Sequence, residues 1–290
     1  MKIPCRDIAH NLEEQLIREV ELLKTSGKIP KLVTVLVGSE PEQISFVNIK
    51  RRTAEKIGVE FELVHLSEKP SFAEFKNFVH EKAHDPKTTG IIIQHPFPEE
   101  YNLNEVYNLI PGKKEIEGHR PDSTFHFPLS IAVLCGIKYI QTLEAGESNP
   151  TKTILNFAED KPALYQFLQD KNIVIAGRGI TGGAPIAKAL QDIGVPFTIT
   201  NSQTSNPTEI YNSADIIITA TGKKIINPSD IKKGVILLNV GLRKEDGKLK
   251  GDYDEDEIAT IASYYTQTPG GLGPLDVLYL FKNVIEATKK

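Results

Sequence analysis

The sequence predicts an α/β fold of two domains, each built on a parallel sheet that helices cover. Short, β-branched apolar runs alternate with helical patterns in both halves of the chain, as they do in βαβ units. The length of 290 residues fits about two domains. A G-x-G-x-x-G motif follows a predicted strand in the second half, which is its usual position in doubly wound sheets.

The first half of the chain predicts three helices and three strands in alternation. The first helix begins near Asp7, which can cap it, and ends at Gly27, and its apolar residues recur at helical spacing. Further helices are predicted at 42–57 and from Ser71 onward. The remaining apolar runs are short and typical of buried parallel strands: 32–37, 61–66 and 90–94.

The second half repeats this alternation after a polar stretch. The pattern lapses between residues 137 and 152, and we place a domain boundary after residue 142, so that the second domain covers 143–270. Asp246 and Gly247 predict a tight turn inside a hairpin. The other elements are a helix ending at Asp170, strands at 172–176, 197–200, 216–220 and 235–239, and helices at 184–193 and 274–288.

Composition excludes several classes of function. Hydrophobic residues make up 40% of the chain and the formal net charge is −4, so the chain lacks the basic surface that binds nucleic acid or anionic membranes in bulk. It has no apolar run of about 18 residues and no apolar signal-peptide core. Cys5 and Cys135 are too few for a disulfide framework or a thiolate zinc site. We expect a cytoplasmic protein without a metal and without nucleic-acid or membrane partners.

The glycine motif indicates a dinucleotide site. Gly177, Gly179 and Gly182 stand between a predicted strand and a predicted helix. Glycines allow the tight turn and the close approach of a pyrophosphate, and the N–H groups at the helix start favour negative charge. A glycine-rich turn without a ligand is the alternative interpretation.

The next strand favours NADP over NAD. An NAD site usually carries an acidic residue at the end of that strand, which binds the ribose diol, whereas this strand ends in Thr200, Asn201 and Ser202. Arg178 and Ser202 can donate hydrogen bonds to a phosphate on the adenosine ribose. On the alternative interpretation, Arg178 only covers the surface.

Six segments together resemble the methylenetetrahydrofolate dehydrogenase/cyclohydrolases of one-carbon metabolism. They follow that family's order and spacing over nearly the whole chain: VGSEPEQISFVNIK (37–50), GIIIQHPFP (90–98), PGKKEIEGHRP (111–121), GRGITGGAP (177–185), NSQT (201–204) and TQTPGGLGP (266–274). The resemblance implies an oxidoreductase and hydrolase that oxidises methylenetetrahydrofolate with NADP and hydrolyses the methenyl product to formyltetrahydrofolate, a step that serves purine biosynthesis.

The resemblance also implies an architecture. Residues 1–142 would form the catalytic, folate-binding domain and 143–270 a Rossmann-type NADP-binding domain. The C-terminal helix at 271–290 would return to pack on the catalytic domain, and the folate would lie in the cleft between the two domains. The family's common state is a homodimer.

The resemblance assigns catalytic roles to Lys50, Gln94 and Glu117. Phe46 and Lys50 stand where the family has Tyr-x-x-x-Lys, and this spacing places an aromatic ring and an amine on one helical face. The ring can pack on the pterin or aminobenzoyl group, and the amine can act as general acid or base. Gln94 would fix the amine, and Glu117 would accept hydrogen bonds from the pterin. Taken alone, these residues could be core, surface and loop residues.

Further site residues follow from the same resemblance. The backbone of Pro269, Gly270 and Gly271 would line the site near the substrate, or form only a turn before a helix that begins at Pro274. The cofactor site would add Thr204, Val240 and Gly241.

The chain departs from the family pattern at several positions. Phe46 replaces tyrosine, Glu117 replaces aspartate, Gly179 replaces serine and Asp276 replaces threonine, while 149–152 replaces a Pro-Cys-Thr-Pro segment. His95 replaces a usual leucine, and we assign it no role. Two alternatives stay open: a dehydrogenase of another small substrate, such as a shikimate-like acid, and a divergent relative without activity.

Overall fold

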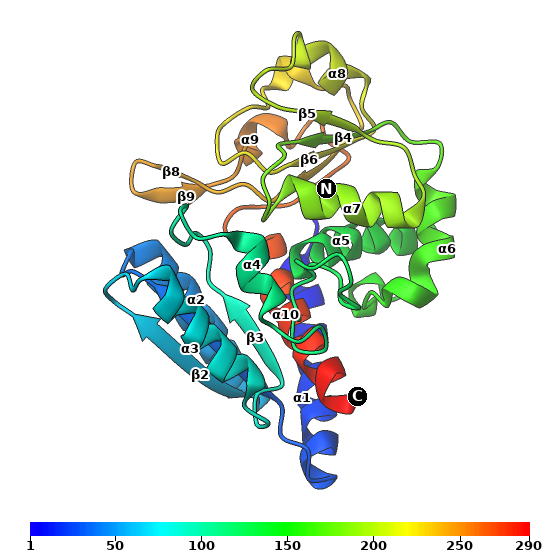
Figure 1. Ribbon diagram of the computed structural model, residues 1–290. Coiled ribbons are helices and arrows are strands. Elements are labelled where there is room, and N and C mark those ends of the chain that lie inside the picture. Colours follow the sequence, from blue (N-terminus) through cyan, green and yellow to red (C-terminus); the bar gives the residue numbers. More distant parts are fainter. The chain divides into compact units, whose positions relative to one another are not determined.

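The computed structural model describes residues 1–290, which pack into two compact units. One unit combines Met1–Leu12 with Leu129–Asp276, and the other combines Glu13–Pro128 with Val277–Lys290. Helices α1 (Cys5–Thr25) and α10 (Leu272–Lys289) each belong partly to both units (Figure 1). The predicted α/β fold of two domains, with a C-terminal helix that returns to the first domain, is confirmed.

The unit that contains Glu13–Pro128 is built on a parallel sheet of three strands, in the order β2-β1-β3. These strands are β1 (Lys31–Val37), β2 (Glu60–Leu66) and β3 (Gly90–Ile93). The central strand β1 is buried from its second residue onward and β3 throughout, which explains why both read as continuous apolar runs.

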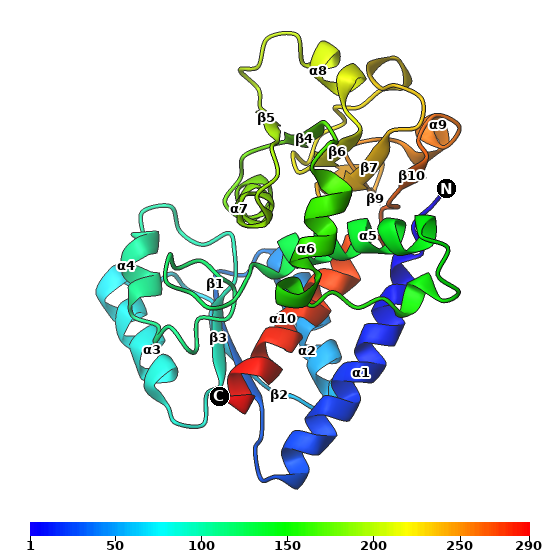
Figure 2. The same ribbon diagram turned by 90° about the vertical axis from the view of Figure 1, so that its right-hand side faces the viewer.

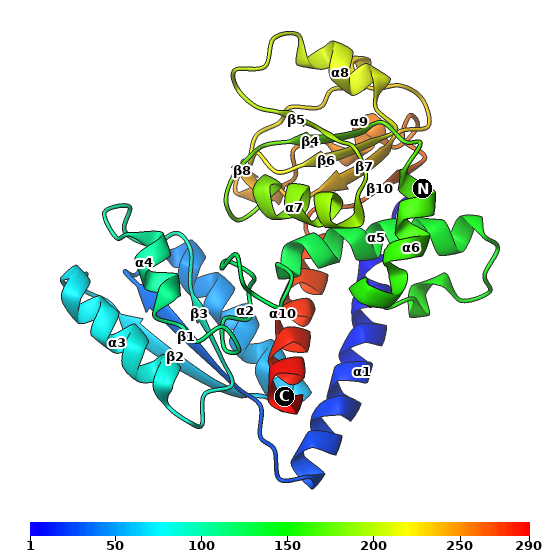
Figure 3. The same cartoon turned by 45° about the vertical axis from the view of Figure 1, so that its right-hand side comes forward.

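Helices cover both faces of this sheet. Helices α3 (Phe72–His84) and α4 (Leu103–Asn108) lie on one face, and α2 (Pro41–Ile57) lies on the other (Figures 2 and 3). Alternate residues of β1 point to opposite faces, so Val33 and Val35 share a core with Phe75 of α3. A capping box at Ser71 starts α3, and Gly58, with a φ of 84°, ends α2.

The order of the strands identifies one edge of this sheet at which a ligand is expected. From β1, the chain adds β2 on one side and β3 on the other. The order therefore reverses next to β1, and open α/β sheets bind ligands at such a point, outside the carboxyl ends of their strands. Gln94 directly follows β3 at this edge, and α2 follows the end of β1.

The second unit is built on a parallel sheet of five strands, in the order β10-β7-β6-β4-β5. Helices α5, α6 and α7 lie on one side of it, and α8 and α9 on the other (Figure 2). The strands are β4 (Ile173–Ala176), β5 (Thr198–Thr200), β6 (Ile216–Thr219), β7 (Ile236–Asn239) and β10 (Tyr264–Tyr265). The helices are α5 (Pro128–Glu144), α6 (Phe157–Leu168), α7 (Gly183–Ile193), α8 (Pro207–Ser213) and α9 (Glu255–Ile258).

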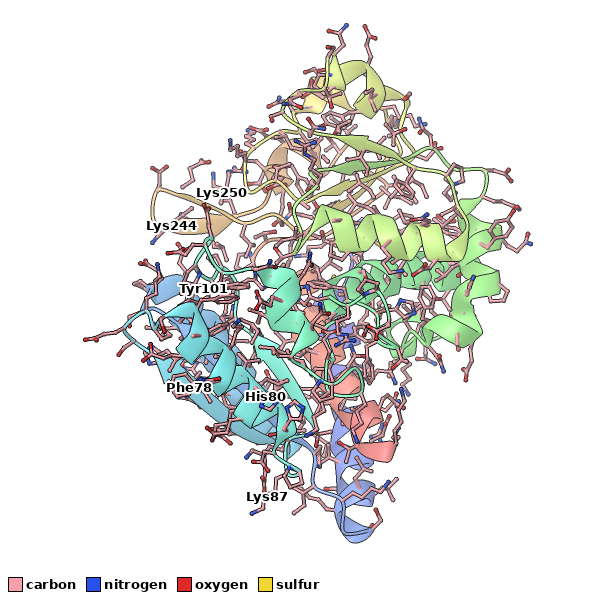
Figure 4. All side chains as sticks on the ribbon, viewed as in Figure 1. Phe78, His80, Lys87, Tyr101, Lys244 and Lys250 are labelled. Carbon is pink, nitrogen blue, oxygen red and sulfur yellow. The ribbon has the colours of Figure 1, made fainter.

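A hairpin interrupts this unit after β7. It consists of β8 (Arg243–Glu245) and β9 (Lys248–Lys250), and Lys244 and Lys250 of the hairpin are labelled in Figure 4. Asp246 and Gly247 form the turn with φ values of 51° and 72°, which is the left-handed backbone that a tight hairpin turn requires. The predicted hairpin is confirmed.

Several local predictions differ from the structure. Helix α5 continues to Glu144, so the helical pattern does not lapse at residue 137. The two compact units divide before Leu129. Pro274 is the third residue of α10 and not the first. The short elements α4, α8, α9 and β10 were not predicted, because elements of seven residues or fewer carry little periodicity. The functional domain limits of 1–142, 143–270 and 271–290 stay predictions.

None of the helices is both long and apolar enough to cross a membrane.

Candidate active site

Lys50 and Gln94 meet at the carboxyl edge of the three-stranded sheet. Lys50 lies on α2, and its Nζ donates a hydrogen bond of 2.8 Å to Oε1 of Gln94. The Gln94 amide is itself fixed, because its Nε2 donates to the carbonyl oxygen of His95 at 2.9 Å and its backbone N–H donates to Val35 of β1 at 2.9 Å. Gln94 is buried and Lys50 is half-buried. The amine therefore has a defined position at the point where ligands are expected.

Phe46 lies one helical turn before Lys50 on α2 and is 44% exposed. A large aromatic ring with that exposure provides a free apolar surface beside the amine, since residues four apart share a helix face. Gln43, earlier on the same helix, is buried and donates through Nε2 to the carbonyl oxygen of Pro96. This bond ties the start of α2 to the loop after β3.

The loop that carries Glu117 is held from inside by Glu115. Glu115 is 1% exposed and accepts the backbone N–H groups of Glu117 at 3.0 Å and of Arg120 at 3.3 Å. Between them, Gly118 has a φ of 81°, and a Cβ there would lie 2.6 Å from the carbonyl oxygen of Phe125. Only glycine fits this position. The two acidic residues thus differ. The Glu115 carboxylate holds the backbone of the loop, whereas the Glu117 carboxylate makes no such bond to the backbone and can bind a ligand.

Glu117 belongs to a buried cluster with His95, Tyr107 and His119. Oε2 of Glu117 lies 3.6 Å from Nε2 of His119. The His119 ring stacks on Tyr107 with a centroid distance of 4.2 Å, and the Tyr107 hydroxyl lies 2.9 Å from Nε2 of His95. No role was predicted for these three partners, because aromatic and histidine residues far apart in the chain give no periodic signal.

The cluster shifts the pKa values of its members. Burial alone would raise the pKa of Glu117, but His119, Lys50 and His95 together hold it below its ordinary value. Burial lowers the pKa of His95 to about 4; the nearby Glu117 carboxylate opposes this shift, whereas His119 and Lys50 add to it. At neutral pH the cluster therefore holds an ionised carboxylate beside a neutral His95.

The glycine motif forms a tight turn between β4 and α7. Gly177 has a φ of 112°, and a Cβ there would lie 2.5 Å from the carbonyl oxygen of Ala220. Gly179 has no neighbour that an added Cβ would meet within 4 Å, so its backbone is open to a ligand. Gly182 packs on Ala220. Gly183 is the most crowded, because a Cβ on Gly183 would lie 2.0 Å from the carbonyl oxygen of Gly177. Gly183, the tightest position of the turn, was not among the predicted site residues.

Arg178 and Ser202 follow neighbouring strands at the same sheet edge. Ala176, the last residue of β4, pairs with Thr200, the last residue of β5. Arg178 and Ser202, two residues further along each segment, are exposed. Thr204 closes the second loop, because its Oγ1 accepts the N–H of Asn201 at 2.9 Å. The structure places no acidic residue at the end of β5. This edge, open and with a glycine turn, fits a dinucleotide that carries an additional phosphate.

Val240 and Gly241 follow β7 at this edge, and both donate their N–H groups to Thr219 of β6, at 2.7 and 3.1 Å. Buried Asn239 accepts from the Thr219 hydroxyl and the N–H of Asp252, at 2.9 and 2.7 Å. These bonds fix the backbone of 239–241. Because the N–H groups of Val240 and Gly241 are already used, a ligand has to contact other atoms of this segment.

Gly270 and Gly271 form a constrained turn after a cis peptide bond between Thr268 and Pro269. Gly270 has a φ of 90° beside the Arg6 guanidinium, and a Cβ at Gly271 would lie 2.3 Å from the carbonyl oxygen of Gln267. Pro269 is exposed. The turn is rigid, and its role toward a substrate stays a prediction.

The predicted site residues thus form two sets, one in each compact unit. Lys50, Gln94, Glu117 and the ring of Phe46 belong to the unit of Glu13–Pro128, whereas the glycine turn and the 200–204, 239–241 and 269–271 segments belong to the other unit. No group of three or more His, Cys, Asp or Glu side chains is arranged to hold a metal ion.

We predict that the ring resonances of His95 titrate with a midpoint near pH 4. Because the pKa of His95 is about 4 in the fold and about 6.5 in the unfolded chain, the unfolded state binds this proton first as the pH falls. The contribution of neutral His95 to stability is complete above about pH 6.5 and is lost between there and about pH 4, on the order of 3 kcal/mol.

Histidine-selective NMR over this pH range measures the titration, and His95→Leu assigns the resonance and should flatten the pH dependence of the free energy of unfolding. A midpoint at pH 6 or above would contradict the buried, neutral state.

Comparison with known proteins agrees with both units. Residues 3–117 match the catalytic-domain model of tetrahydrofolate dehydrogenase/cyclohydrolase, and residues 159–290 match its NAD(P)-binding-domain model. The bifunctional protein FolD of Staphylococcus saprophyticus is 32% identical over 288 residues, covering 98% of this chain and 95% of that protein.

Solved structures show the same fold. The FolD methylenetetrahydrofolate dehydrogenase/cyclohydrolase of Campylobacter jejuni is 24% identical and covers 100% of this chain and 98% of its own, with a TM-score of 0.85. The FolD of Trypanosoma brucei, solved with NADP and an inhibitor, is 23% identical and covers 100% of this chain and 97% of its own, with a TM-score of 0.84. The predicted resemblance is confirmed, and the chain belongs to the tetrahydrofolate dehydrogenase/cyclohydrolase family.

Proposed function

We propose that this chain oxidises methylenetetrahydrofolate with NADP and hydrolyses the methenyl product to formyltetrahydrofolate. Membership of the dehydrogenase/cyclohydrolase family supports both reactions. The observation that carries the proposal is the hydrogen bond of 2.8 Å between Lys50 and Gln94 at the carboxyl edge of the sheet. A divergent relative without activity would have no reason to keep this pair.

Hydrolysis depends on Lys50. Water must lose a proton as it attacks the cationic one-carbon bridge, and an amine held at one position can accept that proton and later return it. Gln94 serves as the positioning residue, because its oxygen accepts from the amine while its nitrogen is occupied by His95. This arrangement leaves the amide only one orientation toward Lys50.

Glu117 binds the pterin. Its carboxylate is ionised, since His119, Lys50 and His95 outweigh the effect of burial on its pKa. An ionised carboxylate accepts two hydrogen bonds side by side, which suits the adjacent N–H donors of a pterin. The exposed ring of Phe46 provides an apolar surface for the flat part of the same molecule.

The five-stranded sheet binds the dinucleotide. NADP supplies the hydride acceptor when bound, and the backbone of Gly177, Gly179 and Gly182 allows its pyrophosphate to approach the start of α7. Arg178 and Ser202 bind the additional phosphate. Thr204 shapes the loop that carries Ser202, and 240–241 and 269–271 line the site with backbone atoms.

A homodimer, which the family resemblance implies, and a cytoplasmic location, which the composition of the chain predicts, remain predictions. The same holds for the absence of nucleic-acid partners, which rests on the net charge of −4.

Replacing Lys50 with methionine tests the proposal. Lys50→Met keeps a long apolar side chain but removes the amine, so hydrolysis of the methenyl compound should fall about a hundredfold or more. Hydride transfer should partly survive, because it depends mainly on positioning. An absorbance assay that follows the methenyl compound as it forms and decays measures both rates.

The matched control is Lys56→Met, which changes an exposed lysine on the same helix α2. Equal loss of both reactions in Lys50→Met, with Lys56→Met normal, would refute the assignment of Lys50 to hydrolysis. A wild-type chain inactive on folate but active on another small substrate would support the rival dehydrogenase.

Arg178 tests the choice of coenzyme. Arg178→Ala should weaken NADP binding by about 1.5 to 3 kcal/mol, the range for charge-assisted hydrogen bonds, and leave NAD binding nearly unchanged. Fluorescence titration with each coenzyme measures this difference. Lys188→Ala on α7 is the control, since Lys188 is exposed and pairs with Asp192. Equal losses for the two coenzymes would show that Arg178 does not bind the phosphate.

A further inference from the structure

We propose that His119 is a positioning residue for Glu117, and that its Nε2 holds one carboxylate oxygen of Glu117 so that the other faces the substrate. The proposal deepens the proposed function and rests on the role of Glu117 as the pterin anchor. It explains how a glutamate can bind the pterin at a position where the family has aspartate.

The two groups face each other in a buried place. Oε2 of Glu117 lies 3.6 Å from Nε2 of His119, with the side chains 14% and 8% exposed. Neither of these two atoms has a hydrogen-bond partner. Buried polar atoms without partners are rare in folded proteins and call for an explanation. The separation exceeds a hydrogen bond by only a few tenths of an ångström, so a small rotation of the Glu117 side chain closes the pair.

Packing fixes the His119 ring more firmly than the Glu117 side chain. The ring stacks on Tyr107 at a centroid distance of 4.2 Å, with an interplanar angle of 24°. The ring of Phe127 meets it edge-on at 5.1 Å, and the ring of His95 lies 5.4 Å away. Contacts with three aromatic rings leave the imidazole few orientations. Its Nε2 is therefore a fixed point to which a flexible carboxylate can attach.

A glutamate needs such a fixed point. Its side chain has one more rotatable bond than aspartate, and ordering a longer side chain costs more conformational entropy. A carboxylate that must accept hydrogen bonds from a planar ligand loses affinity when its oxygens are not held in place. His119 meets this need because it lies two residues along the same loop, across the constrained Gly118.

The charges around the pair favour the same arrangement. The groups that face Glu117 are His119 on its own loop, Lys50 on α2 and His95 after β3, and all three favour the ionised carboxylate. Tyr107 on α4 and Glu115 on the loop complete the titratable surroundings. An ionised Glu117 can only accept hydrogen bonds. The pair therefore requires that Nε2 of His119 carries a proton.

Two substitutions separate the donor from the shape of the ring. His119→Phe keeps an aromatic ring for Tyr107 but removes Nε2, and His119→Gln places an amide N–H near the position of Nε2. We expect His119→Phe to weaken tetrahydrofolate binding by about tenfold or more and His119→Gln by about threefold or less. NADP affinity should stay unchanged in both. Anaerobic titration calorimetry measures both affinities.

The control is His80→Phe, because His80 is exposed on α3 in the same unit (Figure 4), and it should bind both ligands as the wild type does. The proposal is overturned if His119→Phe binds tetrahydrofolate within about twofold of the wild type. It is also overturned if His119→Gln is as weak as His119→Phe, because packing alone would then explain the loss.

NMR of the wild-type chain gives a readout that does not depend on folding of a variant. The nitrogen resonances of the His119 ring should place a proton on Nε2, which is the atom that faces Oε2 of Glu117. A His119 ring whose Nε2 carries no proton would overturn the proposal.

A further variant separates this inference from the proposed function. Glu117→Gln keeps the size of the side chain but turns one acceptor into a donor, so it should strongly weaken tetrahydrofolate binding. If Glu117→Gln binds normally, the anchor role itself fails. If Glu117→Gln fails to bind while His119→Phe binds normally, only the role of His119 fails.

Discussion

The hydrogen bond between Lys50 and Gln94 is the interaction on which the account of this protein depends. The two residues are 44 positions apart in the sequence, and they meet because the strand order β2-β1-β3 brings α2 and the end of β3 to the same edge. The buried amide of Gln94 accepts from the amine on one side and donates to a backbone carbonyl on the other. The fold thus turns an ordinary helical lysine into a group with a fixed position.

A second constraint is the cost of holding charge inside this unit. Glu117 is buried, and burial would favour its neutral form. Three basic groups from separate segments offset this effect, whereas burial lowers the pKa of His95 to about 4 in spite of the nearby Glu117 carboxylate. The cluster around Glu117 therefore holds an ionised carboxylate near the Lys50 amine, which is a suitable environment for a substrate with both N–H donors and a cationic bridge.

Much of the fold could be predicted from the sequence, and part of the site could not. The strands around 32–37, 90–94 and 172–176 are apolar on both faces and lie between helices with clear periodicity, so each appears in the structure within a residue or two. Lys50 and Gln94 could be paired only through the family resemblance. His95, Tyr107 and His119 were not predicted as a cluster, because they come from three irregular or short segments whose meeting depends on tertiary packing.

The most direct test of the central claim is the rate of hydrolysis after replacing Gln94 with methionine, alone and together with Lys50→Met. Gln94→Met keeps a long side chain but removes the oxygen that accepts from the Lys50 amine. Hydrolysis should fall about tenfold or more while hydride transfer changes much less, and Gln94→Met should add no further loss to Lys50→Met, because the two residues act as a pair. Unchanged hydrolysis in a folded Gln94→Met variant, or losses that add in the double variant, would contradict the role of the Lys50–Gln94 pair.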